Sequence, residues 1–118
     1  MRYNGVYIGK PGLESRYCEY LRFYPDKTVI VVTTECDPSA LQDIKAWFDI
    51  ENGWPKNQGG QFSLGKVKSQ SDNISFFATS PEGKVHYRGK AYSRRIFLRH
   101  HSLINGARGY DVYSFVRW

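Results

Sequence analysis

The chain has 118 residues, which is enough for one domain with its own core, and we expect a single domain over residues 1–118. Aromatic side chains make up 16% of the residues, the formal net charge is +6 and the mean hydropathy is −0.56. No apolar stretch is long enough for a membrane-spanning helix and none resembles a signal peptide, so the sequence predicts a cytoplasmic protein.

Alternation of apolar and polar residues predicts eight β-strands along the chain. They cover residues 4–10, 17–24, 28–34, 60–67, 73–79, 84–92, 95–101 and 110–117. Short strands in hairpin order are typical of an antiparallel up-and-down barrel, because closure removes the edges of the sheet. We therefore expect a mainly β protein built as an eight-stranded barrel.

The clearest local signal is the hairpin within residues 20–34. Pro25 presets the backbone angle of the first central turn position, and Asp26 suits the second. Lys27 follows at a position that is often left-handed and then favours glycine. The sequence therefore predicts backbone strain at Lys27.

One short helix is expected between the third and fourth strands, over residues 38–51. Asp37 is a suitable N-cap, and Pro38 suits the first helical position. Apolar residues then recur at helical spacing, at Leu41, Ile44 and Phe48. We expect this stripe to pack over one end of the barrel.

The two cysteines, Cys18 and Cys36, are too few for a disulfide scaffold. Pairing in the hairpin places Cys18 opposite Thr34, with Cys36 diagonal to it and within reach of a bridge of non-ideal geometry. The expected intracellular setting favours two free thiols, while the sequence alone leaves the bridge open.

Several pieces of this sequence resemble a small calycin-like, that is lipocalin-like, β-domain. That domain occurs at the C-terminus of some F-box proteins and in stand-alone bacterial proteins. The matching pieces are Gly5–Ile8 (GVYI), Leu21–Asp26 (LRFYPD), Thr28-Val29 and His101–Asn105 (HSLIN), within a resemblance that runs from Gly5 to Val116. The resemblance implies a barrel with a binding role and supplies no catalytic residues.

This chain departs from the family pattern in three ways. Lys27 stands where the family turn has glycine, and Gly5-Val6-Tyr7 stands where a lipocalin has Gly-x-Trp. A chain of this length has no room for an F-box, so nothing supports a ubiquitin-ligase adaptor role.

The interior of an eight-stranded barrel is either filled by side chains or holds one small ligand. The expected inward residues are Leu21, Phe23, Val29, Val31, Phe62, Leu64, Ile74, Phe76, Val85, Tyr87, Ile96, Leu98 and Phe115, with the helix residues Leu41, Ile44 and Phe48. So many bulky side chains favour a solid core over a cavity.

Arg22 is the residue whose direction matters most to function. It alternates with Leu21 and Phe23, but Ile30 and Val32 share its face, so the sequence does not decide which face is inside. An inward Arg22 would be a buried anchor for an anion or a carboxylate. The candidate ligand-binding residues are Arg22, Tyr20, Tyr24, Tyr87 and Trp47.

Positive charge is concentrated in the last third of the chain. Residues 1–83 hold nine Lys or Arg and ten Asp or Glu, whereas residues 84–118 hold eight Lys or Arg and one Asp. Alternation puts the cations of two neighbouring strands on one outer face, where an anionic partner would meet Lys84, Arg88, Lys90, Arg95 and Arg99. A solvated sheet face explains the same pattern, and it is the favoured interpretation.

Signals for catalysis, metals and cofactors are absent from the sequence. His100 and His101 are adjacent and point to opposite faces of their strand, and no carboxylate near the His86–His101 pair completes a metal site. No nucleophile elbow or phosphate-binding loop occurs. We therefore expect no cofactor and no catalytic residues, with a histidine-based hydrolase or isomerase as the least favoured hypothesis.

The leading functional hypothesis is a non-enzymatic binding or protein-interaction module that holds a small apolar ligand in the barrel. The alternative is a binder of an anionic partner, such as nucleic acid, acidic lipid or acidic protein, through residues 84–101. The aromatic positions do not match a ribonucleoprotein-type stacking platform, so the sequence disfavours nucleic acid.

Overall fold

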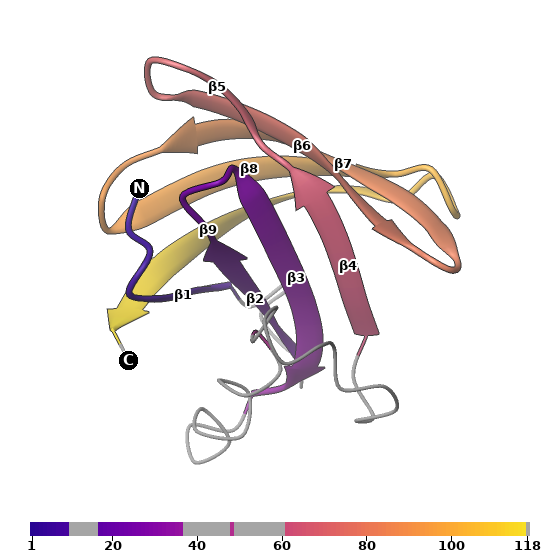
Figure 1. Cartoon of the computed structure of the whole chain (residues 1–118). Coiled ribbons are helices and arrows are strands. Elements are labelled where there is room, and N and C mark those ends of the chain that lie inside the picture. The colour runs from indigo at the N-terminus through magenta and orange to yellow at the C-terminus, as the bar shows by residue number, and fades with distance from the viewer. Residues whose placement is uncertain (10–16, 37–47, 49–60, 118) are drawn as a thin grey trace.

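The structure is a computed structural model that describes residues 1–9, 17–36, 48 and 61–117. All of the secondary structure in these residues is β (Figure 1). The strands are β1 (Gly5–Gly9), β2 (Tyr17–Phe23), β3 (Thr28–Glu35), β4 (Gln61–Lys66), β5 (Lys68–Gln70), β6 (Asn73–Ser80), β7 (Gly83–Ala91), β8 (Arg95–Ser102) and β9 (Arg108–Arg117). In the described part of the chain, no helix is long and apolar enough to cross a membrane.

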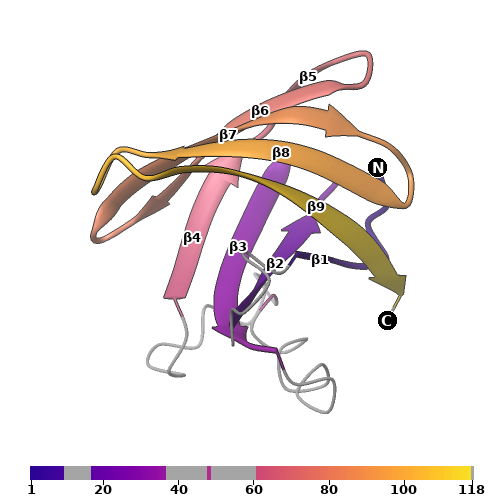
Figure 2. The same ribbon diagram turned by 180° about the vertical axis from the view of Figure 1, so that it is seen from behind.

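The strands form a closed antiparallel barrel of eight strands, with β5 as an additional short strand. Each strand pairs with its sequence neighbour, β1 pairs with β9, and β4 reaches β6 to close the sheet. Figures 1 and 2 show β6–β9 arching over β1–β4, with the two chain ends on the same side of the barrel. The mainly β fold and the up-and-down order are therefore as the sequence predicts.

Barrel closure depends on a glycine in β4. A Cβ atom on Gly65 would lie 2.4 Å from the backbone carbonyl oxygen of Phe77 in β6, closer than two such atoms approach. The absent side chain allows the backbones of β4 and β6 to come together. A single residue type at this position thus permits the closed form.

Aromatic rings run through the barrel interior. Tyr7 packs edge-on against Phe23 with ring centroids 5.7 Å apart, Phe23 packs similarly against Phe76 at 6.1 Å, and Phe76 stacks on Tyr87 at 4.9 Å. Aliphatic residues of the other strands complete this inner core, which contains Leu21, Val29, Val31, Val67, Ile74, Ala78, Ile96, Leu98 and Tyr113. The filled interior agrees with the solid core that the sequence favours.

A second apolar cluster lies on the outside of β1, β2 and β3. Phe48 is fully buried there and packs with Val6, Cys18, Tyr20, Ile30 and Val32. The hydroxyl of Tyr24 donates a hydrogen bond to the carbonyl oxygen of Phe48. We call this surface the covered face, and it explains why β2 and β3 are apolar on both sides.

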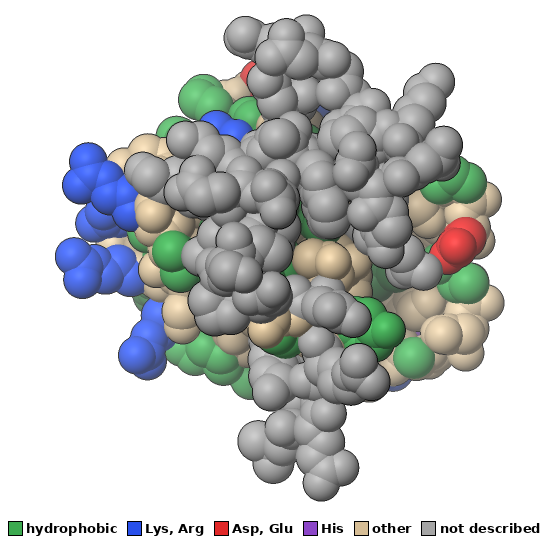
Figure 3. All heavy atoms as spheres, turned by 90° about the horizontal axis from the view of Figure 1, so that it is seen from below, with side chains coloured by type: hydrophobic (Ala, Val, Ile, Leu, Met, Phe, Trp, Pro, Cys, Tyr) green, Lys and Arg blue, Asp and Glu red, His purple; other side chains and the backbone are tan. Residues whose placement is uncertain are grey.

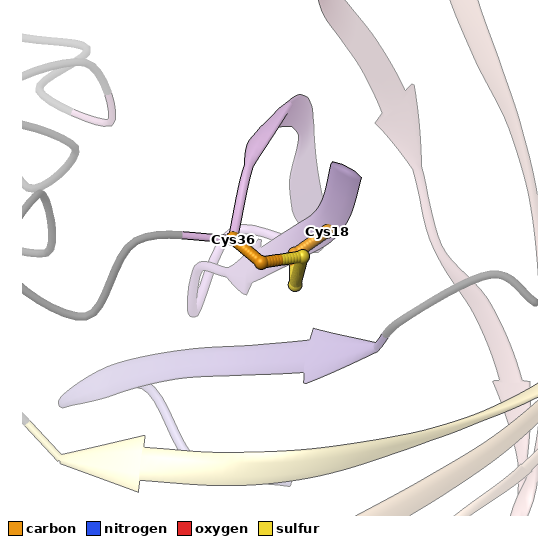
Figure 4. Close-up of a disulfide and its surroundings, with 2 residues drawn as sticks. All are labelled: Cys18 and Cys36. Carbon is orange, nitrogen blue, oxygen red and sulfur yellow. A yellow bond between two sulfur atoms is a disulfide. The ribbon is translucent and has the colours of Figure 1, made fainter. Parts of the chain in front are cut away.

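Cys18 and Cys36 form a disulfide at the edge of the covered face (Figure 4). Their Cα atoms are 4.9 Å apart, within the ordinary range for a bridge. The expectation of two free thiols is therefore wrong. The diagonal pairing across β2 and β3 had already brought the two residues within reach.

The turn between β2 and β3 places Lys27 in the left-handed region, with φ 71°. The amide of Lys27 donates to the carbonyl of Tyr24 at 3.0 Å, and the amide of Tyr24 donates to the carbonyl of Thr28 at 2.9 Å. This is a tight turn followed by a left-handed bulge residue, a common three-residue hairpin loop. The strain predicted at Lys27 is confirmed.

Three expectations about individual elements need correction or stay open. Leu64 is 43% exposed and lies outside the barrel, because Gly65 is the residue of β4 that pairs with Val29 inside. Strand β5 was not expected. The predicted helix over residues 38–51 lies outside the described residues except for Phe48, which is in a turn and packs on the covered face rather than in the barrel.

Candidate functional site

The outward residues of β6, β7, β8 and β9 form a broad surface, which we call the basic face. These residues alternate with the inner core and include the cations Lys84, Arg88, Lys90, Arg95, Arg99 and Arg108, all of them exposed. No outward position on these four strands carries Asp or Glu. Every residue of the anionic-partner set expected from the sequence therefore lies on one face.

The register of the strands brings two arginines into direct opposition. Arg88 of β7 pairs with Arg99 of β8, which in turn pairs with Tyr110 of β9. The next row contains Lys90, Phe97 and Val112. Like charges that face each other across a sheet destabilise it by about 0.2–1 kcal/mol unless a counter-charge lies nearby.

A groove lies along these two rows and has a volume of about 640 Å³. Its outward lining alternates cations with aromatic rings: Arg88, Lys90, Tyr92, Phe97, Arg99 and Tyr110. Tyr92 and Tyr110 are 46% and 57% exposed, so their rings are accessible. Tyr92 packs edge-on against Phe97 at 5.9 Å between centroids, which fixes the relative orientation of the two rings.

The positive potential of the basic face also acts on a histidine. His86 stacks on Phe77 with ring centroids 4.4 Å apart and pairs across the strands with His101. Partial burial lowers the pKa of His86, and the charges of Arg88 and His101 lower it further. His86 thus reports the electrostatic potential of this surface.

Figure 3 shows Lys and Arg side chains along one side of the molecule. On the opposite half of the barrel, Lys66 contacts Asp26 at 3.8 Å between charged atoms and is 70% exposed. Among the described residues, no ion pair is found for Arg88 or Arg99. The two halves therefore differ in the balance of charge on their surfaces.

A second polar constellation lies inside the barrel, near the end where β8 turns into β9. The hydroxyl of Tyr113 donates to Oε1 of Glu19 at 2.9 Å, and Tyr87 also hydrogen bonds this carboxylate. Nearby, Nδ1 of His100 lies 3.4 Å from Oδ2 of Asp111. We call these five residues the inner cluster.

Burial dominates the electrostatics of the inner cluster. It raises the pKa of Glu19, and the hydrogen bonds from Tyr87 and Tyr113 offset only part of this effect. Burial also raises the pKa of Tyr87 and of Tyr113 well above the ordinary tyrosine value, and the neighbouring Glu19 charge adds to the effect. Both tyrosines are therefore hydrogen-bond donors throughout the physiological range.

Gly109 makes room for the histidine of the inner cluster. A Cβ atom at Gly109 would lie 2.4 Å from Cε1 of His100, so any side chain there would displace the imidazole ring. The ring is held between this glycine and Asp111 of the same strand. The geometry fixes the ring but brings no nucleophile or third metal ligand beside it among the described residues.

The candidate ligand-binding set expected from the sequence is divided by the structure. Tyr20, Arg22 and Tyr24 lie on the outside of β2, and the guanidinium of Arg22 lies 4.9 Å from the centre of the Tyr24 ring. Only Tyr87 of the set points into the barrel. Trp47 lies outside the described residues.

No family model, curated protein or solved structure matches this chain. The resemblance to calycin-like domains therefore stays a prediction. The functional argument depends on the chemistry of the basic face and the inner cluster.

The sequence analysis missed Glu19 and Asp111, although their positions carried a signal. Glu19 shares a strand face with Leu21 and Phe23, and Asp111 shares one with Tyr113. A carboxylate on an otherwise apolar strand face indicates a buried polar partner, since an unpaired buried charge is very costly.

Proposed function

We propose that this protein is a non-enzymatic binding module that takes an anionic partner on its basic face. The observation that carries the proposal is the direct opposition of Arg88 and Arg99 on a four-strand surface that has no carboxylate at any outward position. Such a surface raises the local concentration of polyanions and speeds their association. A bound anion would also relieve the repulsion between the two guanidinium groups.

The alternative is a small apolar ligand held inside a calycin-like barrel. The ring contacts from Tyr7 through Phe23 and Phe76 to Tyr87 weigh against it, since these side chains fill the space that a ligand would need. Native mass spectrometry tests this alternative. A mass equal to that of the bare chain supports the basic face, and a copurifying apolar compound supports the barrel.

A binding assay against several polyanions tests the main proposal. The full chain is titrated with heparin, polyglutamate, anionic vesicles and oligonucleotides at low and at high salt. We expect binding to at least one of them that weakens as salt rises. Absence of binding to every polyanion at low salt would overturn the proposal.

NMR titration of His86 locates the binding surface. Arg88 and Lys84 flank this residue on β7, His101 faces it on β8 and Phe77 stacks on it from β6. We expect a bound polyanion to raise the pKa of His86, because it neutralises the charges that now lower it. An unchanged His86 titration with saturating polyanion would contradict binding at the basic face.

A cytoplasmic location stays a prediction. Disulfides are rare in the cytoplasm, where thiols are kept reduced. Protein recovered from cells with an intact Cys18–Cys36 bond would contradict this location.

A further inference from the structure

The groove on the basic face carries more information than its charge. Its two rows place cations beside aromatic rings, with Arg99 next to Tyr110 and Lys90 next to Phe97. Lipid headgroups and acidic peptides supply negative charge but no repeating planar groups. A nucleic acid strand supplies a phosphate and a planar base in every residue.

We propose that the partner is a single-stranded nucleic acid, with its phosphates on Arg88, Arg99 and Lys90 and its bases on the rings of Phe97 and Tyr110. This inference rests on the proposed function. It names the chemical class of the anionic partner and assigns separate roles to the cations and the rings of one groove.

The exposure of the rings supports the assignment. Tyr110 is 57% exposed although it stands beside two arginines on a rigid strand, so its ring is held in place and open to a stacking partner. Phe97 is held by its edge-on contact with Tyr92. Stacking on such rings contributes about 1–3 kcal/mol per base, which is comparable to the phosphate contacts.

The same geometry discriminates between nucleic acid forms. In a duplex the faces of the bases are stacked on one another, so they are unavailable to Phe97 and Tyr110. Asn73 at the end of the groove adds an amide that can hydrogen bond an exposed base edge. We therefore expect a preference for single strands and only weak preference among sequences.

The test measures fluorescence anisotropy of labelled oligothymidine of about 15 nucleotides, a length that covers the site of a small β-barrel. The full chain is titrated against the single strand, the matching duplex, heparin and phosphatidylserine vesicles. We expect the single strand to bind at least about tenfold more tightly than the duplex, the margin that one stacked base provides.

Two kinds of variant separate the roles of the groove residues. Arg88→Ser/Arg99→Ser should weaken binding and reduce the slope of log affinity against log salt by about two, one for each lost phosphate contact. Tyr110→Ala should weaken binding by about tenfold and leave that slope unchanged. The control Lys66→Ser/Arg117→Ser removes the same charge outside the groove and should change affinity by less than about threefold.

The outcomes distinguish this inference from the proposed function. Equal affinity for duplex or heparin, or no effect of Tyr110→Ala on oligonucleotide binding, would overturn the single-strand assignment and leave an anion-binding face. Failure of every polyanion to bind would overturn both. Thermal melting of each variant checks that it is folded, and the exposed positions make large losses of stability unexpected.

Discussion

The two halves of the barrel use the same strand pattern but complete their outer faces differently. On β1–β3 the outward residues are apolar, and Phe48 covers them from another part of the chain. On β6–β9 the outward residues are cations and partly exposed aromatic rings. A strand face that is buried twice adds stability, whereas a face left open and charged costs some stability and remains available for a partner.

The largest expected effect contrasts two phenylalanines on the outside of the barrel. Phe48→Ala should lower the free energy of unfolding by about 3–5 kcal/mol, because it leaves a cavity in the covered face. Phe77→Ala, at a position that is 48% exposed on the basic face, should lower it by less than about 1 kcal/mol. Chemical denaturation measures both, and equal losses would show that the two faces are not distinct.

The disulfide is the next largest contribution, and it belongs to the covered half alone. Reduction of the Cys18–Cys36 bond, which joins residues 18 positions apart, should lower the free energy of unfolding by about 3 kcal/mol. Denaturation with and without reductant measures this, and intact mass should rise by two hydrogens. The Cys18→Ala/Cys36→Ala variant should respond to reductant no further, and an equal response would implicate another effect of the reagent.

Glu19 joins the halves, because β2 supplies it and β7 and β9 supply its tyrosine partners. Burial raises its pKa above the model value of 4.5, so the folded chain binds this proton more tightly than the unfolded chain. The contribution of Glu19 to stability is therefore greatest at low pH and falls as pH rises through the folded pKa. Glu19→Gln should flatten this decline and stabilise the protein at neutral pH.

Melting temperatures of the native chain and of Glu19→Gln, compared between pH 4 and 8, test that sign. The matched control is Glu82→Gln in the exposed turn between β6 and β7, which should follow the native profile. A native chain that gains stability relative to Glu19→Gln as pH rises would contradict the buried-carboxyl assignment.

The smallest expected effect is at the turn of the covered half. Lys27→Gly should raise the free energy of unfolding by about 1 kcal/mol, because glycine adopts a φ of 71° without strain. Lys27→Ala removes the same charge but keeps the Cβ atom and should give no gain. Thermal melting distinguishes them, and a gain in the alanine variant would assign the effect to charge instead.

Local patterns were sufficient for most of the fold. Period-two alternation located eight of the strands, and the Pro25-Asp26 turn fixed the register of β2 against β3, both of which depend on neighbours in sequence. The position of Leu64 was misjudged because its strand is apolar on its outer side and has Gly65 inside. Strand β5 is too short to show a period.

The candidate site was only half accessible to sequence reasoning. The cations of β7 and β8 could be assigned to one face, but the placement of Tyr110 beside Arg99 required the pairing of β8 with β9. That pairing brings an exposed ring into the charged row and changes what the surface fits. The inner cluster needs β2, β7, β8 and β9 together, which no local pattern specifies.

The sequence by itself determined the β class, the order of the strands and the concentration of positive charge, because each is a property of residues close together in the chain. Only the tertiary structure decided which side of each strand became the interior. Arg22 faces outward because Phe48 covers that face, and Glu19 faces inward because tyrosines from distant strands hydrogen bond it. Burial depends on what packs against a face, and that partner comes from elsewhere in the chain.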